Sequence, residues 1–342
     1  MTKILEVITP GLLTTIQDRG RHGYQAFGMP VAGAVDEFAL RVANILVGNP
    51  EGAAALEMTL LGPKLKVLAP VKVALTGADL GARINGAEFP RWETVAVNPG
   101  DEISFTAARE GCRAYLAVAG GIDVPEVMGS RATYLRGKIG GIDGRALKAG
   151  DVLSAGSLQE RNLPTGTRLA EGLIPKYSSA ITLRVIPGPQ DDHFTEAGLE
   201  TFFQSEYTVT TEADRMGYRL QGPTIEHKEG ADIISDGIPL GAVQVPGHGL
   251  PIVMLADRQT TGGYPKIATV CSVDLSLIGQ AKPGDTVRFA TIGREEALQL
   301  LQDRETALKK WKDSLPRATG RSWNFQISIA GQRFSTYVEE IR

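Results

Sequence analysis

The sequence predicts a mainly β protein that contains a few helices. Its 40 glycines and 19 prolines are spread through the chain and separate many short apolar runs, as is typical of β-rich folds with frequent turns. One phrase also recurs, because a Gly-Asp pair precedes apolar residues in 98–101, 148–151 and 282–285. Each copy predicts a turn that leads into a strand, and the repetition indicates barrel-like units built from similar hairpins.

Four runs predict strands. Residues 71–75 and 113–118 are mostly apolar runs of strand length. Residues 181–186 alternate apolar and polar side chains, which is the pattern of a strand with one face in solvent. Residues 251–256 are apolar throughout, which indicates a buried strand.

Helices are expected in three places. Residues 36–47 carry apolar side chains at helical spacing, and Gly48 and Pro50 then end the helix. Residues 195–204 are a shorter candidate. The third helix, 294–312, opens with acidic residues and closes with lysines, as the helix dipole favours. The apolar residues near one face of this third helix are Leu298, Leu301, Leu308 and Trp311.

The end of the chain predicts a hairpin. Apolar and polar residues alternate over 323–329, a turn follows at 330–332, and 334–338 returns. The best candidate linker is 157–179, which is rich in Pro, Gly, Thr and charged residues. We therefore divide the chain into an N-terminal β-rich half (1–175), a C-terminal half (176–292) and a C-terminal helix with hairpin (293–342).

Composition and charge exclude several classes of function. The 342 residues include 36 Lys and Arg against 39 Asp and Glu, and without a basic run we expect no nucleic acid partner. The start of the chain lacks the features of a signal peptide, and no apolar stretch is long enough to cross a bilayer, so a cytoplasmic protein is expected. Cys112 and Cys271 are expected to be buried, reduced thiols. The four histidines are scattered without metal-ligand spacing, so no metal site is expected.

The first polar cluster, residues 17–24, combines arginines, acids and glycines. Glycines let the backbone approach a ligand, and arginine offers a planar fork for a carboxylate or phosphate. Asp18, Arg19 and Arg21 are therefore candidate substrate-binding residues. The alternative is that Asp18 pairs with one of the arginines and only holds a loop.

The second polar cluster covers residues 214–219. Arg215, close to a glycine, is a candidate anion-binding residue, and Tyr218 is a candidate substrate contact. The alternative is that Tyr218 is an ordinary strand residue with Arg219 on the opposite face.

The third polar cluster, residues 257–266, follows the predicted buried strand directly and is the most suggestive. Asp257 could serve as a general base, Arg258 could hold an anionic group, and Thr260 or Thr261 could bind an oxyanion. The alternative is a solvated turn that Asp257 caps. We take Asp257, Arg258 and Thr261 as candidate catalytic residues. The candidate substrate contacts in this cluster are Gln259, Gly262, Gly263 and Tyr264.

A nucleotide site is not evident in this chain. Residues 137–144 are glycine-rich, but their spacing matches neither the P-loop nor the dinucleotide fingerprint. If ATP is involved, the chain shows no standard means of holding it alone. This motivates the prediction of a partner chain.

Three long phrases, at 11–21, 214–220 and 256–265, together resemble one known family. Over roughly residues 3–292 the chain is similar to the family described as allophanate hydrolase subunit 2, as biotin-dependent carboxyltransferase-like protein and as the C subunit of 5-oxoprolinase. A sporulation regulator that antagonises the Kip kinase inhibitor also belongs to it. The resemblance implies cyclophilin-like β-barrel architecture and a companion B subunit, which is Kip-inhibitor-like.

The resemblance implies three candidate functions. The leading hypothesis is the C subunit of an ATP-dependent 5-oxoprolinase, in which the A, B and C subunits together open 5-oxo-L-proline to L-glutamate and ATP is bound with a partner subunit. The second is a carboxyltransferase module that moves a carboxyl group from biotin to a urea-like amide, with the biotin-carrying segments on other proteins. The third is a non-enzymatic regulator that binds a Kip-type kinase inhibitor.

The leading hypothesis requires a site that binds both a carboxylate and an amide. 5-Oxoproline carries a carboxylate, which suits an arginine such as Arg19, Arg215 or Arg258, and a lactam amide, which suits Gln259 and the threonines. Glycine-and-arginine loops that lie far apart along the chain must therefore converge around one small anionic amide.

Overall fold

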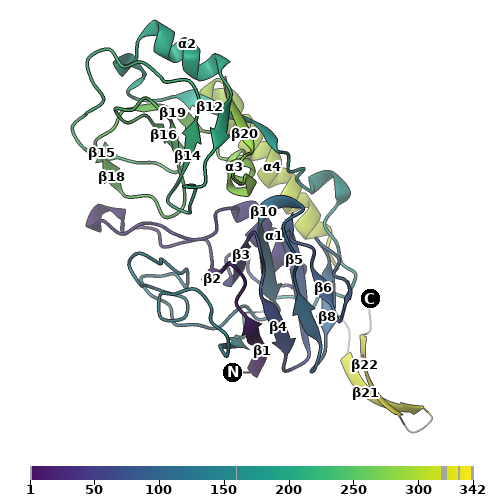
Figure 1. Ribbon diagram of the computed structural model, residues 1–342. Helices are drawn as coiled ribbons and strands as arrows, with labels where there is room; N and C mark the ends of the chain where they lie inside the picture. The colour runs from purple at the N-terminus through teal and green to yellow at the C-terminus, as the bar shows by residue number, and fades with distance from the viewer. Residues whose placement is uncertain (1, 159, 317–321, 330–331, 340–342) are drawn as a thin grey trace.

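The structure is a computed structural model that describes residues 2–158, 160–316, 322–329 and 332–339. It confirms a mainly β fold, in which two packed sheets form the N-terminal half and a closed barrel forms the C-terminal half (Figure 1). A long helix runs beside both halves, and a two-stranded hairpin extends away from the body.

Two sheets build the N-terminal half. The six-stranded sheet has the order β11 (Val152–Ala155), β1 (Thr2–Thr9), β4 (Lys64–Val67), β9 (Glu102–Ser104), β6 (Arg83–Ile84) and β7 (Ala87–Glu88). The five-stranded sheet has the order β2 (Leu13–Gln17), β3 (Ala55–Thr59), β10 (Glu110–Val118), β5 (Val71–Asp79) and β8 (Thr94–Val97).

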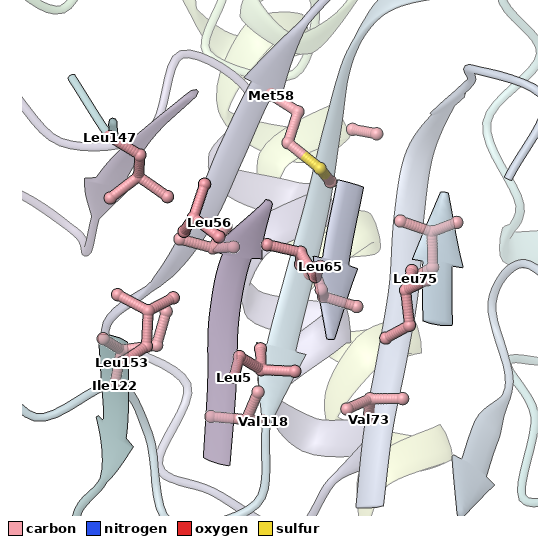
Figure 2. Close-up of a cluster of buried hydrophobic side chains, with 14 of the residues drawn as sticks. Leu5, Leu56, Met58, Leu65, Val73, Leu75, Val118, Ile122, Leu147 and Leu153 are labelled. Atoms are coloured by element: carbon pink, nitrogen blue, oxygen red, sulfur yellow. The ribbon is translucent and has the colours of Figure 1, made fainter. Parts of the chain in front are cut away.

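Strand β10 shows why the central strands are so apolar. Its Leu116 and Val118 join the core between the two sheets, where Leu5 and Leu65 approach from the other sheet (Figure 2). The intervening Tyr115 belongs to a second core that includes helix α1 (Glu37–Leu46). Because both faces of the strand are covered, neither face can be polar along its length.

The barrel closes around a separate apolar core. Its strand order is β12 (Ala180–Pro187), β19 (Lys266–Val270), β16 (Ala242–Gln244), β17 (Ile252–Met254), β14 (Gly217–Gln221), β13 (Tyr207–Val209) and β20 (Thr286–Thr291). Strands β12 and β20 pair in parallel, and the other pairs are antiparallel. In β12, Leu183 and Val185 are fully buried while Thr182 is exposed, which confirms the predicted alternation.

The recurring Gly-Asp phrase forms the same turn three times. The side chains of Asp101, Asp151 and Asp285 each accept a hydrogen bond from the backbone N–H three residues earlier, at 2.7, 2.7 and 3.0 Å. The preceding glycines have φ of +95°, +86° and +93°, a region that costs glycine little. The turns lead into β9, β11 and β20, so the repeated element is a local turn that both halves use.

The helices begin and end close to the predicted residues. Asp36 and Thr195 accept hydrogen bonds from the backbone N–H groups of Ala39 and Gly198, and so cap α1 and α2 (Glu196–Gln204). Helix α3 (Leu275–Gln280) was not predicted, because six residues are too few to show a helical period. In the described part of the chain, no helix has both the length and the apolar composition needed to span a membrane.

Helix α4 (Arg294–Ser314) starts at the end of the barrel and returns to the N-terminal half. Leu308 and Trp311 pack into the core around α1, and Arg41 of α1 donates two hydrogen bonds, of 2.8 and 2.6 Å, to Glu305. Leu298, which the spacing places near the same face, is 48% exposed. The two buried residues of the helix, Leu308 and Trp311, both lie in its second half.

The C-terminal hairpin pairs β21 (Ser322–Ile329) with β22 (Gln332–Glu339) along their full length. The predicted turn at 330–332 lies mainly outside the described residues. Cys112 and Cys271 are free and buried, as predicted.

Candidate functional site

A cluster of buried polar side chains joins the barrel to the N-terminal half; we call Glu57, Arg113, Arg215, Asp257 and Gln280 the polar interface. Arg215, just before β14, donates to both carboxylate oxygens of Asp257, at 3.1 and 2.9 Å. It also donates to Glu57 of β3 and, at 2.6 Å, to the carbonyl of Gly33. One arginine therefore links both halves and the loop before α1.

Glu57 stays ionised at this buried position because it has several partners. Its second oxygen accepts hydrogen bonds from the backbone N–H of Val35, at 2.9 Å, and from the Tyr115 hydroxyl, at 2.7 Å. Burial alone raises the pKa of Glu57, but the charges of Arg215 and Arg113 together with these hydrogen bonds bring it below its ordinary value.

Gln280, at the end of α3, holds the other side of the polar interface. Its Oε1 accepts from the backbone N–H groups of Cys112 and Arg113, at 3.0 and 2.8 Å, and its Nε2 donates to Asp36, at 2.8 Å. Arg113 of β10 donates to the hydroxyl of Tyr218 and, at 2.6 Å, to the carbonyl of Gly279. The predicted substrate contact Tyr218 is thus buried in this interface, at 1% exposure.

A cavity of about 280 Å³ opens on the face of the barrel, and we call it the barrel-face cavity. Most of its lining comes from the barrel, but one residue, Arg136, comes from the loop between β10 and β11 of the N-terminal half. Figure 1 shows that loop on the same side of the molecule as the short strands β15 (Asp236–Gly237) and β18 (Thr261–Gly262). The polar lining residues include Arg136, Asp214, Arg219, Gln244, Gln259 and Tyr264.

Two amide side chains form the neutral part of the cavity wall. Gln244 Nε2 donates to the carbonyl of Tyr264, at 3.2 Å. Gln259 Oε1 is buried and has no hydrogen-bond partner among the described residues, which is costly unless a ligand or water supplies a donor. At Gly262 an added Cβ would lie 2.7 Å from Ile238 and 3.2 Å from Gln244 Nε2. The absence of a side chain at this position therefore leaves space for the side chains of Ile238 and Gln244.

Charged side chains also line the cavity, as exposed pairs. Arg219 lies 3.2 Å from Glu212, and Arg136 lies 3.8 Å from Asp214. All four side chains are at least half exposed. Such pairs are held weakly, because water competes for both partners.

Arg258 is a buried cation without a carboxylate partner in the described part of the chain. It donates to the carbonyls of Ile238 and Leu255, at 2.9 and 3.2 Å. Burial lowers its pKa to about 10, so it remains protonated at neutral pH. Thr261 lies on β18 and is exposed, and the carbonyl of Gly263 accepts from the backbone N–H of Ile233.

The first polar cluster is occupied by contacts within the N-terminal half. Asp18 accepts from the hydroxyl of Ser130, at 2.7 Å, and from the backbone N–H of Arg131, at 2.6 Å. Arg21 is fully buried and donates to the carbonyls of Val127 and Ala132, at 3.0 and 2.9 Å. Arg19 points to the surface and pairs with Glu37, at 2.8 Å.

The structure therefore divides the predicted site residues among several places. Gln259 and Tyr264 line the barrel-face cavity, while Arg215, Tyr218 and Asp257 lie in the polar interface. Arg19, Arg215 and Arg258 do not line this cavity together, so the expected convergence of all three on one ligand is not seen in this chain alone.

Several residues of the site were not predicted. Glu57, Arg113 and Gln244 each lie in a short, mostly apolar strand. This pattern signals a buried polar group that needs a partner, and it could have identified them. Gln280 and Arg136 carry no such signal. Among the residues that the structure describes, no three His, Cys, Asp or Glu side chains are arranged to hold a metal ion.

Comparison with known proteins gives one matching family model, described as the carboxyltransferase domain, subdomain A and B, over residues 27–291. The chain is 39% identical to the C subunit of 5-oxoprolinase from Escherichia coli (strain K12) over 303 residues, which are 88% of this chain and 96% of that protein. It is 35% identical to urea amidolyase of Lachancea kluyveri, over 90% of this chain but 18% of that protein.

Solved structures superpose on this chain as well. The K. lactis urea amidolyase superposes with a TM-score of 0.86 at 33% identity, over 91% of this chain and 20% of that one. The protein TTHA0988 superposes with a TM-score of 0.77 at 37% identity, over 84% of this chain and 55% of that one. These matches confirm the resemblance that the three sequence phrases predicted.

Proposed function

Because this chain belongs to the carboxyltransferase domain family, subdomain A and B, we propose that it is the C subunit of an ATP-dependent 5-oxoprolinase. With the A and B subunits it would open 5-oxo-L-proline to L-glutamate. The observation that carries the proposal is the match to relatives named as the C subunit of 5-oxoprolinase, since this chain accounts for 96% of their length. It accounts for only 17–18% of the urea amidolyases.

The barrel-face cavity supports an amide ligand. Its volume of about 280 Å³ suits a small metabolite. The unpartnered Oε1 of Gln259 can accept a hydrogen bond from a lactam N–H, and the neighbouring Gln244 carries a second amide on the same wall. A ligand amide would then satisfy a buried acceptor that the chain itself leaves without a donor.

The candidate catalytic residues take different roles in this proposal. Asp257 has both oxygens occupied by Arg215, so we assign it to positioning rather than to proton transfer. Arg258 and Thr261 do not line the barrel-face cavity, so in this proposal we assign Arg258 to holding the carbonyls of Ile238 and Leu255 beside it. A lactam is a poor electrophile, so phosphorylation of its oxygen by ATP, bound with a partner subunit, would make it more reactive.

The test is reconstitution of the complete complex. This chain, mixed with the A and B subunits, 5-oxoproline and ATP, should release phosphate and glutamate, and omission of any one component chain should abolish both. Gln259→Ala should lower kcat/KM about tenfold, since one buried hydrogen bond to the ligand is lost. Gln204→Ala, an exposed glutamine on α2, is the matched control. Absence of both products from the complete mixture would refute the proposal.

A second candidate is carboxyl transfer from biotin to a urea-like amide. It is favoured by the TM-score of 0.86 with the K. lactis urea amidolyase. Biotin-dependent incorporation of labelled bicarbonate by the reconstituted complex, without glutamate formation, would select this function instead.

A further inference from the structure

We propose that Arg136 binds the carboxylate of the ligand in the barrel-face cavity, and that the glycine-rich loop 134–144 exists to present it. The inference deepens the proposed function and rests on it, because it specifies the substrate class as an amide that carries a carboxylate. It also gives a role to a glycine-rich segment that matches no nucleotide-binding motif.

The tip of the loop has a defined shape. Tyr134 and Ile139 exchange backbone hydrogen bonds of 2.8 and 3.2 Å, which places Arg136 in the short loop between them. At Gly137 an added Cβ would lie 2.6 Å from the Tyr134 ring, and Lys138 has a φ of +53°. The backbone therefore turns tightly at the position that carries the arginine.

The base of the loop is anchored to the body by buried groups. Arg21 and Asp18 bind the backbone of the segment 127–132 that leads into the loop. At Gly140 an added Cβ would lie 2.0 Å from the carbonyl oxygen of Ala132 and 2.9 Å from Arg21 Nη2, so the loop packs directly on this anchor. Two residues predicted to touch substrate thus act on the loop that carries Arg136.

At the cavity, Arg136 is the charged group whose partner is held most loosely. Its guanidinium lies 3.8 Å from Asp214, beyond hydrogen-bond distance, and makes no hydrogen bond to any described residue. Asp214 does not depend on it, because its other oxygen accepts from the backbone N–H groups of Met216 and Gly217, at 2.8 and 3.1 Å. Arg219 already has a partner at 3.2 Å.

This arrangement distinguishes the two candidate substrates by charge. The carboxylate of 5-oxoproline can accept two hydrogen bonds from the planar guanidinium of Arg136, and its lactam can pair with the glutamines that line the same cavity. Urea is neutral and gains little from the same arginine. A cavity completed by Arg136 therefore favours the anionic amide.

The experiment compares 5-oxoproline with its neutral carboxamide in the complete complex of the A, B and C subunits. Arg136→Ala should lower kcat/KM for 5-oxoproline by about tenfold to a hundredfold, mainly through KM, since a charged hydrogen bond is lost. Turnover of the carboxamide should change less than about twofold, and Arg136→Lys should restore part of the preference. Arg288→Ala removes a similarly exposed, acid-paired arginine of the barrel strand β20, away from the cavity, and should behave as wild type.

Calorimetric binding of both compounds to the wild-type and Arg136→Ala complexes separates this inference from the proposed function. Suppose that the wild type does not turn over 5-oxoproline but binds it more tightly than the carboxamide, and that Arg136→Ala removes this difference in affinity. The inference then holds and the proposed reaction fails. If Arg136→Ala keeps the wild-type preference for the acid, in turnover or in binding, the inference is overturned. Absence of any preference in the wild type overturns it as well.

Discussion

Two arginines only four residues apart form carboxylate pairs that differ in burial. Arg215 is 5% exposed and joins Glu57 and Asp257 in the polar interface, whereas Arg219 is 50% exposed and pairs with Glu212 beside the cavity. Burial decides the difference, because a buried charge cannot exchange its partner for water and an exposed one can. The buried set holds the halves together, and water can open the exposed pair.

The largest expected effect tests the buried side of this comparison. Arg215→Met leaves two carboxylates, Glu57 and Asp257, without their shared partner, so the free energy of unfolding should fall by about 3–5 kcal/mol. Arg219→Met should cost less than about 1 kcal/mol, because water screens its pair. Urea unfolding of both variants measures the two values. Similar losses for the two variants would remove the distinction between the sets.

A smaller effect is expected from a neutral member of the polar interface. Gln280→Ala removes the partner of two backbone N–H groups and of Asp36, and should cost about 2–3 kcal/mol. Burial raises the pKa of Asp36 and the Gln280 amide opposes this most strongly, so the substitution should raise that pKa further. Gln299→Ala on the exposed face of α4 should stay within about 0.5 kcal/mol in the same urea titration. If Gln280→Ala also changed the free energy of unfolding by less than about 0.5 kcal/mol, the Gln280 amide would be dispensable for stability.

The smallest effect is a difference in pH dependence. The pKa of Glu57 is lower in the folded chain than in the unfolded one, where it is about 4.3. Ionised Glu57 therefore stabilises the fold above that pH, and the contribution is lost as the pH falls through the folded value. From about pH 5 to about pH 3, the unfolding free energy of the wild type should fall more steeply than that of Glu57→Gln. Equal slopes for the two proteins would count against a lowered pKa of Glu57.

Much of the fold was predictable because its signals are local. The alternation in β12, the caps of α1 and α2 and the three Gly-Asp turns each depend on a few neighbouring residues. Contacts between distant segments were not predictable in this way. Arg215 meets Glu57 across 158 positions and Gln280 meets Arg113 across 167. A single sequence does not indicate which distant residues contact each other.

The candidate site was predictable in its segments but less so in its roles. The second and third polar clusters supply Arg219, Gln259 and Tyr264 to the cavity, whereas Asp18 and Arg21 of the first make contacts within the N-terminal half. Arg21 resembles a ligand-binding arginine in sequence, yet backbone carbonyls occupy it. Residue type alone does not reveal whether a guanidinium meets a ligand or the chain's own backbone, because both offer the same oxygen acceptors.

Helix α4 has a consequence for how the molecule can move. A chain with two folded bodies and one connection can rotate about that connection, but here the polypeptide crosses from one body to the other twice. The second crossing is fixed at its far end by Trp311 and by the Arg41–Glu305 pair. Hinge rotation is thereby restricted, so a ligand bound as proposed would meet walls whose spacing is already set and would cost little conformational entropy.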